Sequence, residues 1–284
     1  MKSVKLTNSW IILRFLILYT ITTGIFGLFG GLLSGVNLAD NPNLIPTPIQ
    51  NFAIILFELA GTLLIVWYVL KYLDKESINS IGLKSIKIKV ILNGVLTGFL
   101  IMLSGFVLLL LLNQIKIVGT QYKIGSILIN LVAFTAIAFM EEIAIRGYVL
   151  RKLMRWTNKY TALIISSVIF SVLHALNPNI NFLSLINLFF AGVLLGIVYI
   201  YTKNLWFSIA LHFSWNFFQG AIFGFNVSGI EFNSIIIQKI QHNNIWNGGA
   251  FGFEGSVLCI LFQMVSILII FNFFRNYKVK SKSG

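Results

Sequence analysis

Long apolar segments recur along the whole chain and constrain its fold more than any other feature. Each has about 20 residues, the length that a helix needs to cross the hydrocarbon core of a bilayer. Only helices and closed barrels can satisfy their backbone hydrogen bonds inside lipid. The sequence therefore predicts an all-α, polytopic integral membrane protein with about eight transmembrane helices, at roughly residues 9–35, 51–72, 90–112, 125–150, 160–176, 181–202, 205–224 and 256–275.

Composition supports this class and excludes a soluble one. Hydrophobic residues make up 57% of the 284 residues, and only 10% are charged. Mean hydropathy is +0.89. A soluble domain of this size would need far more polar surface to cover its core.

The positive charges predict the orientation of the helices. Lys and Arg cluster after the second, fourth and last apolar segments and Lys203 follows the sixth, whereas the alternate loops hold only Lys116, Lys123 and Lys239. Because basic loops stay in the cytoplasm, we expect both termini there. The net charge of +13 then serves contacts with the lipid bilayer, and no nucleic-acid motif accompanies it.

Neither a repeat nor a linker rich in Gly, Ser or Pro divides the chain. We predict an N-terminal transmembrane pair in residues 1–73, a core in residues 74–256, and a last helix with a basic tail in residues 257–284. Abundant Ile, Asn, Lys and Phe are typical of AT-rich bacterial genomes. The predicted location is therefore a bacterial plasma membrane.

Two adjacent carboxylates, Glu141 and Glu142, interrupt the apolar stretch Ile124–Leu150. A charge near the middle of a bilayer costs roughly 2.5–3.5 kcal/mol on insertion scales, and neighbouring carboxylates also repel each other. Arg146 lies four residues after Glu142, on the same helical face, and can neutralise it. Groups this expensive inside a membrane indicate a functional site.

Two histidines from other apolar segments fall at a similar depth. Glu141 and His174 lie about 16 residues on either side of the predicted turn at 156–158, so in a helical hairpin they sit roughly 24–25 Å from it. The charged residues 151–159 should protrude by about two helical turns, roughly 11 Å, which leaves both side chains roughly 13 Å inside the cytoplasmic boundary. His212 lies about eight residues, or roughly 12 Å, beyond the next turn, and Asn216 shares its helical face. We therefore expect one polar pocket formed by these side chains.

The residue types in this pocket are suited to hydrolysis. A desolvated carboxylate can act as a general base, so Glu141 could deprotonate a water held against His174. His212 and Asn216 could then stabilise an oxyanion. Together these groups predict a water-activating hydrolase site.

Three motifs, Glu141-Glu142-x-x-x-Arg146, Phe170-x-x-x-His174 and His212-x-x-x-Asn216, resemble those of the CPBP family in order and spacing. This family contains the intramembrane type II CAAX prenyl endopeptidases and bacteriocin-processing, immunity and lysostaphin-resistance-like relatives. The resemblance implies a peptidase acting on a membrane-associated peptide or protein. It also implies that the first Glu and first His activate water and that the later His and Asn form the oxyanion hole.

Several alternatives remain open at this point. A catalytically idle scaffold or immunity protein could bind a partner through the same pocket, and a proton-coupled transporter also uses intramembrane Glu and His. Glu141, His174 and His212 are ligand types that zinc accepts, although no His-Glu-x-x-His motif is present. Glu58 and Glu254 are further acidic residues whose roles stay undecided.

Overall fold

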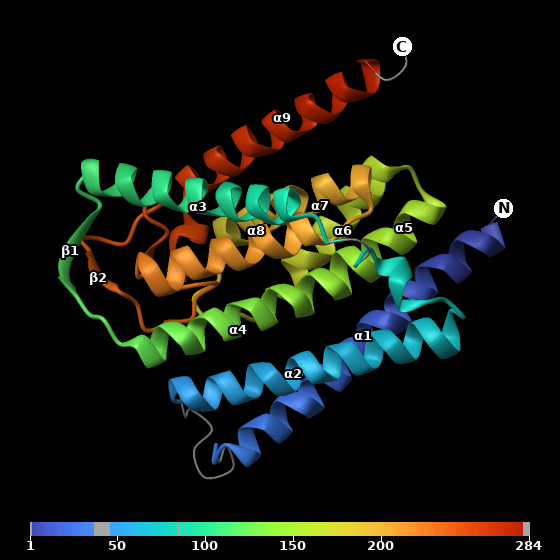
Figure 1. Cartoon of the computed structure of the whole chain (residues 1–284), viewed down its shortest axis with the longest axis horizontal. Coiled ribbons are helices and arrows are strands. Elements are labelled where there is room, and N and C mark those ends of the chain that lie inside the picture. The colour runs from blue at the N-terminus through green and yellow to red at the C-terminus, as the bar shows by residue number, and fades with distance from the viewer. Residues whose placement is uncertain (1, 37–45, 84–85, 281–284) are drawn as a thin grey trace.

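The computed structural model describes residues 2–36, 46–83 and 86–280. Helices dominate this part of the chain and lie side by side along one long axis (Figure 1). They are α1 (Lys2–Leu33), α2 (Pro48–Tyr68), α3 (Ile88–Leu111), α4 (Ile124–Glu142), α5 (Arg151–Trp156), α6 (Lys159–Leu173), α7 (Phe182–Thr202), α8 (Trp206–Asn216) and α9 (Val257–Lys280).

Six stretches of the described residues are helical, long and apolar enough to cross a membrane. They correspond to α1, α2, α3, α4 with its continuation, α7 and α9. Two further predicted spans are shorter: α6 has 15 residues, and α8 has 11 before its winding changes. The predicted all-α, polytopic class is confirmed, while the count of eight spans and the orientation stay predictions.

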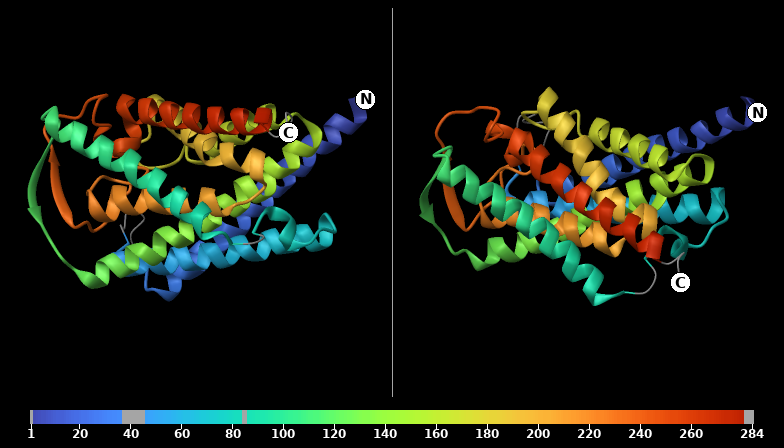
Figure 2. Two further views of the ribbon diagram at one scale, coloured as in Figure 1. Left: turned by 45° about the horizontal axis from the view of Figure 1, so that its top comes forward. Right: turned by 90° about the horizontal axis from the view of Figure 1, so that it is seen from above.

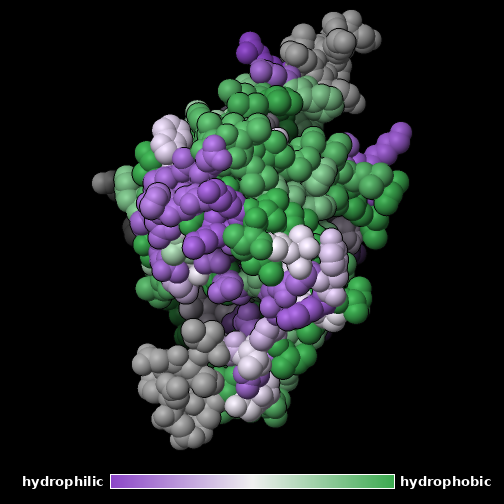
Figure 3. All heavy atoms as spheres, turned by 90° about the vertical axis from the view of Figure 1, so that its left-hand side faces the viewer, coloured by the Kyte–Doolittle hydropathy of each residue, from purple (hydrophilic) through white to green (hydrophobic). Residues whose placement is uncertain are grey.

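The exterior agrees with a membrane-spanning bundle. Seen from the end that carries the two strands, hydrophilic residues gather on the end face and hydrophobic residues surround them (Figure 3). Many large hydrophobic side chains on the outer helices are exposed, among them Ile21 on α1 and Val172 on α6. Lipid is the environment in which such a surface is stable.

Two helices change their winding next to the polar residues. After Glu142, α4 continues as a π-helix over Ile143–Leu150 and then as α5, which makes one rod, Ile124–Trp156. After Asn216, α8 continues as a π-helix over Phe217–Ile222. π-Helical turns are rare and are frequently found at functional sites.

A small antiparallel sheet of β1 (Ile115–Thr120) and β2 (Ile236–Ile240) caps one end of the bundle. The hydropathy analysis did not predict it. Both segments are rich in Ile, and a β-branched side chain packs well on a pleated surface. That composition was the available signal. The sheet joins the α3–α4 connection to the long segment that follows α8.

The first two helices form a tightly packed pair. Gly27 and Gly30 of α1 face α2, and Gly61 of α2 faces α1, so close that a Cβ on any of them would come within about 3 Å of the other helix. Thr47 begins α2 with a capping box completed by Gln50, and Pro48 occupies the first turn. The pair joins the rest of the molecule mainly through α2 on α4.

Candidate active site

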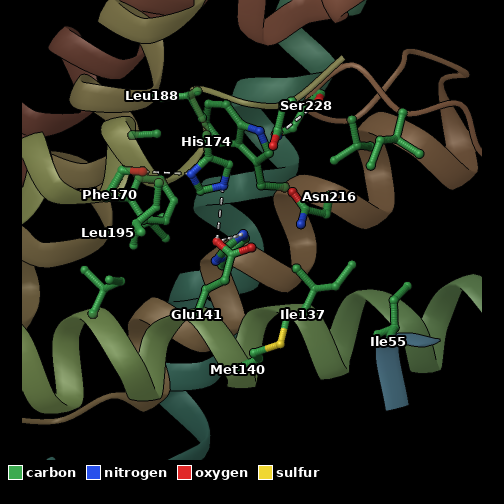
Figure 4. Close-up of a pocket in the computed structure, with 18 of the residues that line it drawn as sticks. Ile55, Ile137, Met140, Glu141, Phe170, His174, Leu188, Leu195, Asn216 and Ser228 are labelled. Carbon is green, nitrogen blue, oxygen red and sulfur yellow. Dashed lines mark hydrogen bonds and ion pairs between the residues drawn. The ribbon is translucent and has the colours of Figure 1, made fainter. Parts of the chain in front are cut away.

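A cavity of about 500 Å³ lies between the α1–α2 pair and the helices α6, α7 and α8, with α4 along one wall. Most of its lining is apolar, including Ile55, Ile137, Leu188 and Leu195 (Figure 4). Glu141, His174, His212 and Asn216, which were predicted from the sequence, are part of the same lining. The cavity therefore combines an apolar groove with a polar centre.

Glu141 projects from α4 into this cavity, and its carboxylate points toward His174 (Figure 4). Its Oε2 atom lies 3.6 Å from Nε2 of His174 and 3.9 Å from Nε2 of His212. Neither distance is a direct hydrogen bond, and within the described residues Oε2 has no hydrogen-bond partner. Three helices thus place one unsatisfied carboxylate oxygen between two imidazole rings.

The second glutamate, Glu142, is fully buried and holds its neighbours in place. Its Oε1 atom accepts a hydrogen bond from Arg146 at 2.7 Å and contacts Nδ1 of His212 at 2.9 Å. Arg146 also donates to the carbonyl of Gly192 at 3.2 Å and lies over the Phe170 ring at 4.4 Å. The predicted pairing of Glu142 with Arg146 is confirmed, and it connects α4 to α7 and α8.

His174 caps the C-terminal end of α6, where its backbone leaves the helical conformation. Its Nδ1 atom lies 2.7 Å from the carbonyl oxygen of Phe170. A carbonyl can only accept, so Nδ1 carries the proton and Nε2 faces Glu141. In the neutral ring that nitrogen is an acceptor.

His212 has the same arrangement, because its Nδ1 atom faces the Glu142 carboxylate. In their neutral forms, both rings therefore direct an acceptor nitrogen at the Glu141 oxygen. Three acceptors cannot satisfy one another. Either one ring takes a second proton or a proton-bearing molecule lies among them.

Asn216 follows His212 by one helical turn, is 4% exposed and lines the same cavity. Its amide lies on the cavity side in Figure 4. Within the described residues no hydrogen bond to this side chain is found. An amide group is therefore available beside the two histidines.

Glu254, which the sequence left undecided, lines the cavity and is 7% exposed. The indole of Trp215 donates to its Oε1 at 2.9 Å, and the backbone N–H and hydroxyl of Ser228 donate to its Oε2 at 2.7 and 3.0 Å. These contacts tie the long segment after α8 to the helix turn that carries Asn216. Sequence reasoning missed Trp215 and Ser228, because their role depends on this fold-back.

Glu58 of α2 also lines the cavity. Asn51, Ile54 and Ile55 of the same helix line the cavity too. Glu58 therefore shares a space with Glu141.

The possible zinc site at Glu141, His174 and His212 stays a prediction. The ligand types suit zinc, but the described residues contain no group of three His, Cys, Asp or Glu side chains placed to hold a metal ion.

Comparison with known proteins gives one family. The family model described as type II CAAX prenyl endopeptidase Rce1-like matches residues 123–218. No curated protein matches the chain. The matched segment runs from the start of α4 to just beyond α8, so it contains Glu141, Glu142, Arg146, His174, His212 and Asn216. α1, α2 and α9 lie outside it. This match, which covers residues 123–218 of the 284, supports the predicted resemblance to the intramembrane proteases of the CPBP family.

Proposed function

We propose that this protein is an intramembrane endopeptidase that hydrolyses a peptide bond of a membrane-associated protein or peptide. The observation that carries the proposal is the convergence of Glu141, His174 and His212 on one point in a cavity with apolar walls. The family match supports protease chemistry in general. The expected location is the plasma membrane of a bacterium.

In the proposed reaction, Glu141 and His174 hold a water molecule and Glu141 accepts its proton as the oxygen attacks the peptide carbonyl. His212, carrying a second proton beside two carboxylates, and the Asn216 amide donate to the oxyanion. When the carbon–nitrogen bond breaks, the proton on Glu141 passes to the leaving amine. Arg146 and Glu142 take no part in proton transfer and position His212.

The substrate in this proposal enters the cavity as an extended segment. Apolar walls bind its apolar side chains, and the polar centre receives the scissile bond. Bacteriocin precursors, peptide pheromones and the termini of membrane proteins have this character. An idle scaffold or immunity protein is the alternative, and it requires the same pocket without turnover.

The test compares membrane peptides in cells that carry the wild-type protein or a variant, using mass spectrometry. We expect Glu141→Gln, His174→Ala and His212→Ala each to lower product formation at least ~10²-fold, because they remove the base, a side chain that holds the attacking water and an oxyanion donor, respectively. Glu231→Gln is the matched control, since Glu231 is exposed and does not line the cavity. Treatment of the wild-type protein with a chelator should leave the rate unchanged.

Protein levels must be equal in all strains for this comparison. Full turnover by Glu141→Gln at normal abundance would exclude the proposed base. If the wild-type protein is expressed and no peptide product depends on it, the alternative of a catalytically idle scaffold is correct.

A further inference from the structure

Acidic side chains are unevenly distributed in this basic protein. The chain has 8 Asp and Glu residues against 21 Lys and Arg. Three of the eight, Glu58, Glu141 and Glu254, line the central cavity, and within the described residues no Lys or Arg lines it. The cavity is therefore the place in the molecule that favours a positive charge on a bound molecule.

The three carboxylates differ in what already binds them. Glu254 accepts three hydrogen bonds from Trp215 and Ser228. Glu141 lies between two histidines. Glu58 has no hydrogen bond or ion pair within the described residues, so its carboxylate is the one left for a ligand.

Packing against α1 sets the position of the Glu58 carboxylate. A Cβ atom built on Gly27 would lie 2.8 Å from Glu58 Oε1 and 3.2 Å from its Cγ. Glycine at position 27 therefore leaves the space in which the Glu58 side chain rests. A methyl group there would move the carboxylate without removing its charge.

Uncharged polar residues share this cavity with Glu58. They include Asn51, seven residues before Glu58 on α2, and Thr20 and Thr23 of α1. Charged groups inside membranes are tolerated where they face such a cavity and find a partner of opposite charge. The other walls are apolar, so the ligand must combine apolar side chains with a single cation.

We propose that Glu58 is a specificity residue that binds a Lys or Arg side chain of the peptide substrate. The α1–α2 pair lies outside the segment that matches the family model, so this preference would be a property that the pair adds to the core. This inference rests on the proposed function, because it takes the bound peptide to be the substrate of the peptidase. Its test measures binding, and cleavage is recorded separately.

The probes are short fluorescent Leu/Ala peptides in which one Lys is moved along the sequence, each with a counterpart that carries Gln in its place. Binding to the full-length protein in lipid nanodiscs is measured by anisotropy. We expect the wild-type protein to bind the best Lys peptide about tenfold more tightly than its Gln counterpart, which corresponds to about 1.4 kcal/mol. Glu58→Gln should remove this difference, and Glu58→Lys should reverse it in favour of a Glu peptide.

Two further variants separate position and charge from general damage. Glu231→Gln removes an exposed carboxylate that does not line the cavity, and it should keep the tenfold ratio. Gly27→Ala should lower the ratio while it leaves every charge in place. A wild-type protein without a Lys preference at any position, or a preference that survives Glu58→Gln, would overturn the inference.

The outcomes also distinguish this inference from the proposed function. A Lys preference that depends on Glu58, without cleavage of any peptide, supports the binding site and contradicts the peptidase. Cleavage of Lys and Gln peptides at equal rates and equal affinities supports the peptidase and contradicts the specificity.

Discussion

Arg146 is the residue whose environment is most fully determined by its contacts. It is 1% exposed, lies 2.7 Å from Glu142 and 3.2 Å from the Gly192 carbonyl, and stacks over the Phe170 ring. A guanidinium group can make all three contacts at once because it is planar and carries five donors. Arg146 thereby links Glu142 on α4 to α6 through Phe170 and to α7 through Gly192.

We expect Arg146→Leu to reduce the folded, membrane-inserted population sharply. Removing one partner of a buried ion pair costs about 3–5 kcal/mol, because the Glu142 charge is left without compensation. Arg146→Lys should recover abundance only in part, since an ammonium group lacks the planar fork. Protein levels by immunoblot and the unfolding midpoint in detergent measure both effects. Normal levels of Arg146→Leu would show that the pair contributes little.

At the scale of elements, an ionic clamp joins the segment after α2 to α5. Glu76 pairs with Arg151, with Lys152 at 2.6 Å and with Arg155 at 2.6 Å, and Asp74 adds a contact to Lys152 at 3.0 Å. Partial burial by itself would raise the pKa of Glu76, but hydrogen bonds from the three basic side chains outweigh it and lower the pKa to about 2. The clamp fixes the end of the rod that carries Glu141.

This lowered pKa predicts a pH dependence of stability. The charged form of Glu76 is favoured in the folded state, so its contribution is complete above the unfolded pKa of 4.5 and is lost as the pH falls toward 2. We expect the unfolding midpoint of the purified protein to decrease as the pH is lowered from 5 to 3. This interval overlaps the range between the unfolded and folded pKa values of Glu76, 4.5 and about 2. Glu76→Gln should show a smaller fall over the same interval, with Glu231→Gln as the control. Equal falls in all three proteins would mean that the clamp adds nothing.

At the scale of the whole molecule, the N-terminal end of α1 and the C-terminal end of α9 lie at the same end of the bundle, and the β1–β2 sheet lies at the opposite end (Figures 1 and 2). The prediction that both termini face the cytoplasm needs this arrangement, although the arrangement does not say which side is cytoplasmic. α6 has 15 residues, so His174 lies about 22 Å from the turn that precedes it.

We therefore expect the substrate to be cut within a few residues of the cytoplasmic edge of an apolar segment. The helix-rise argument places Glu141 and the histidines roughly 12–13 Å inside that edge. An extended peptide covers ~3.3 Å per residue, so about four residues reach the cavity. Mass spectrometry of product termini measures the position. Cuts confined to the external edge would show that the orientation or the depth argument is wrong.

The sequence alone determined the class of the protein and the identity of its polar residues. Apolar segments of membrane-spanning length can only be helices in lipid, and Glu141, Glu142, Arg146, His174 and His212 stood out because each is expensive in such a segment. The spacing from the predicted turns also placed both histidines at the same depth as Glu141, because the rise per residue of a helix is fixed. The division into residues 1–73, 74–256 and 257–284 stays a prediction.

Only the tertiary structure decided what surrounds these residues. Glu58 lines the cavity because the α1–α2 pair packs on α4. Glu254 lines it because the chain after α8 folds back and is held by Trp215 and Ser228. Neither contact has a periodic signature, because each joins residues far apart in the chain through packing and hydrogen bonds. The orientation of both imidazole rings was likewise set by their Nδ1 partners, the Phe170 carbonyl and the Glu142 carboxylate, which only the folded chain brings into place.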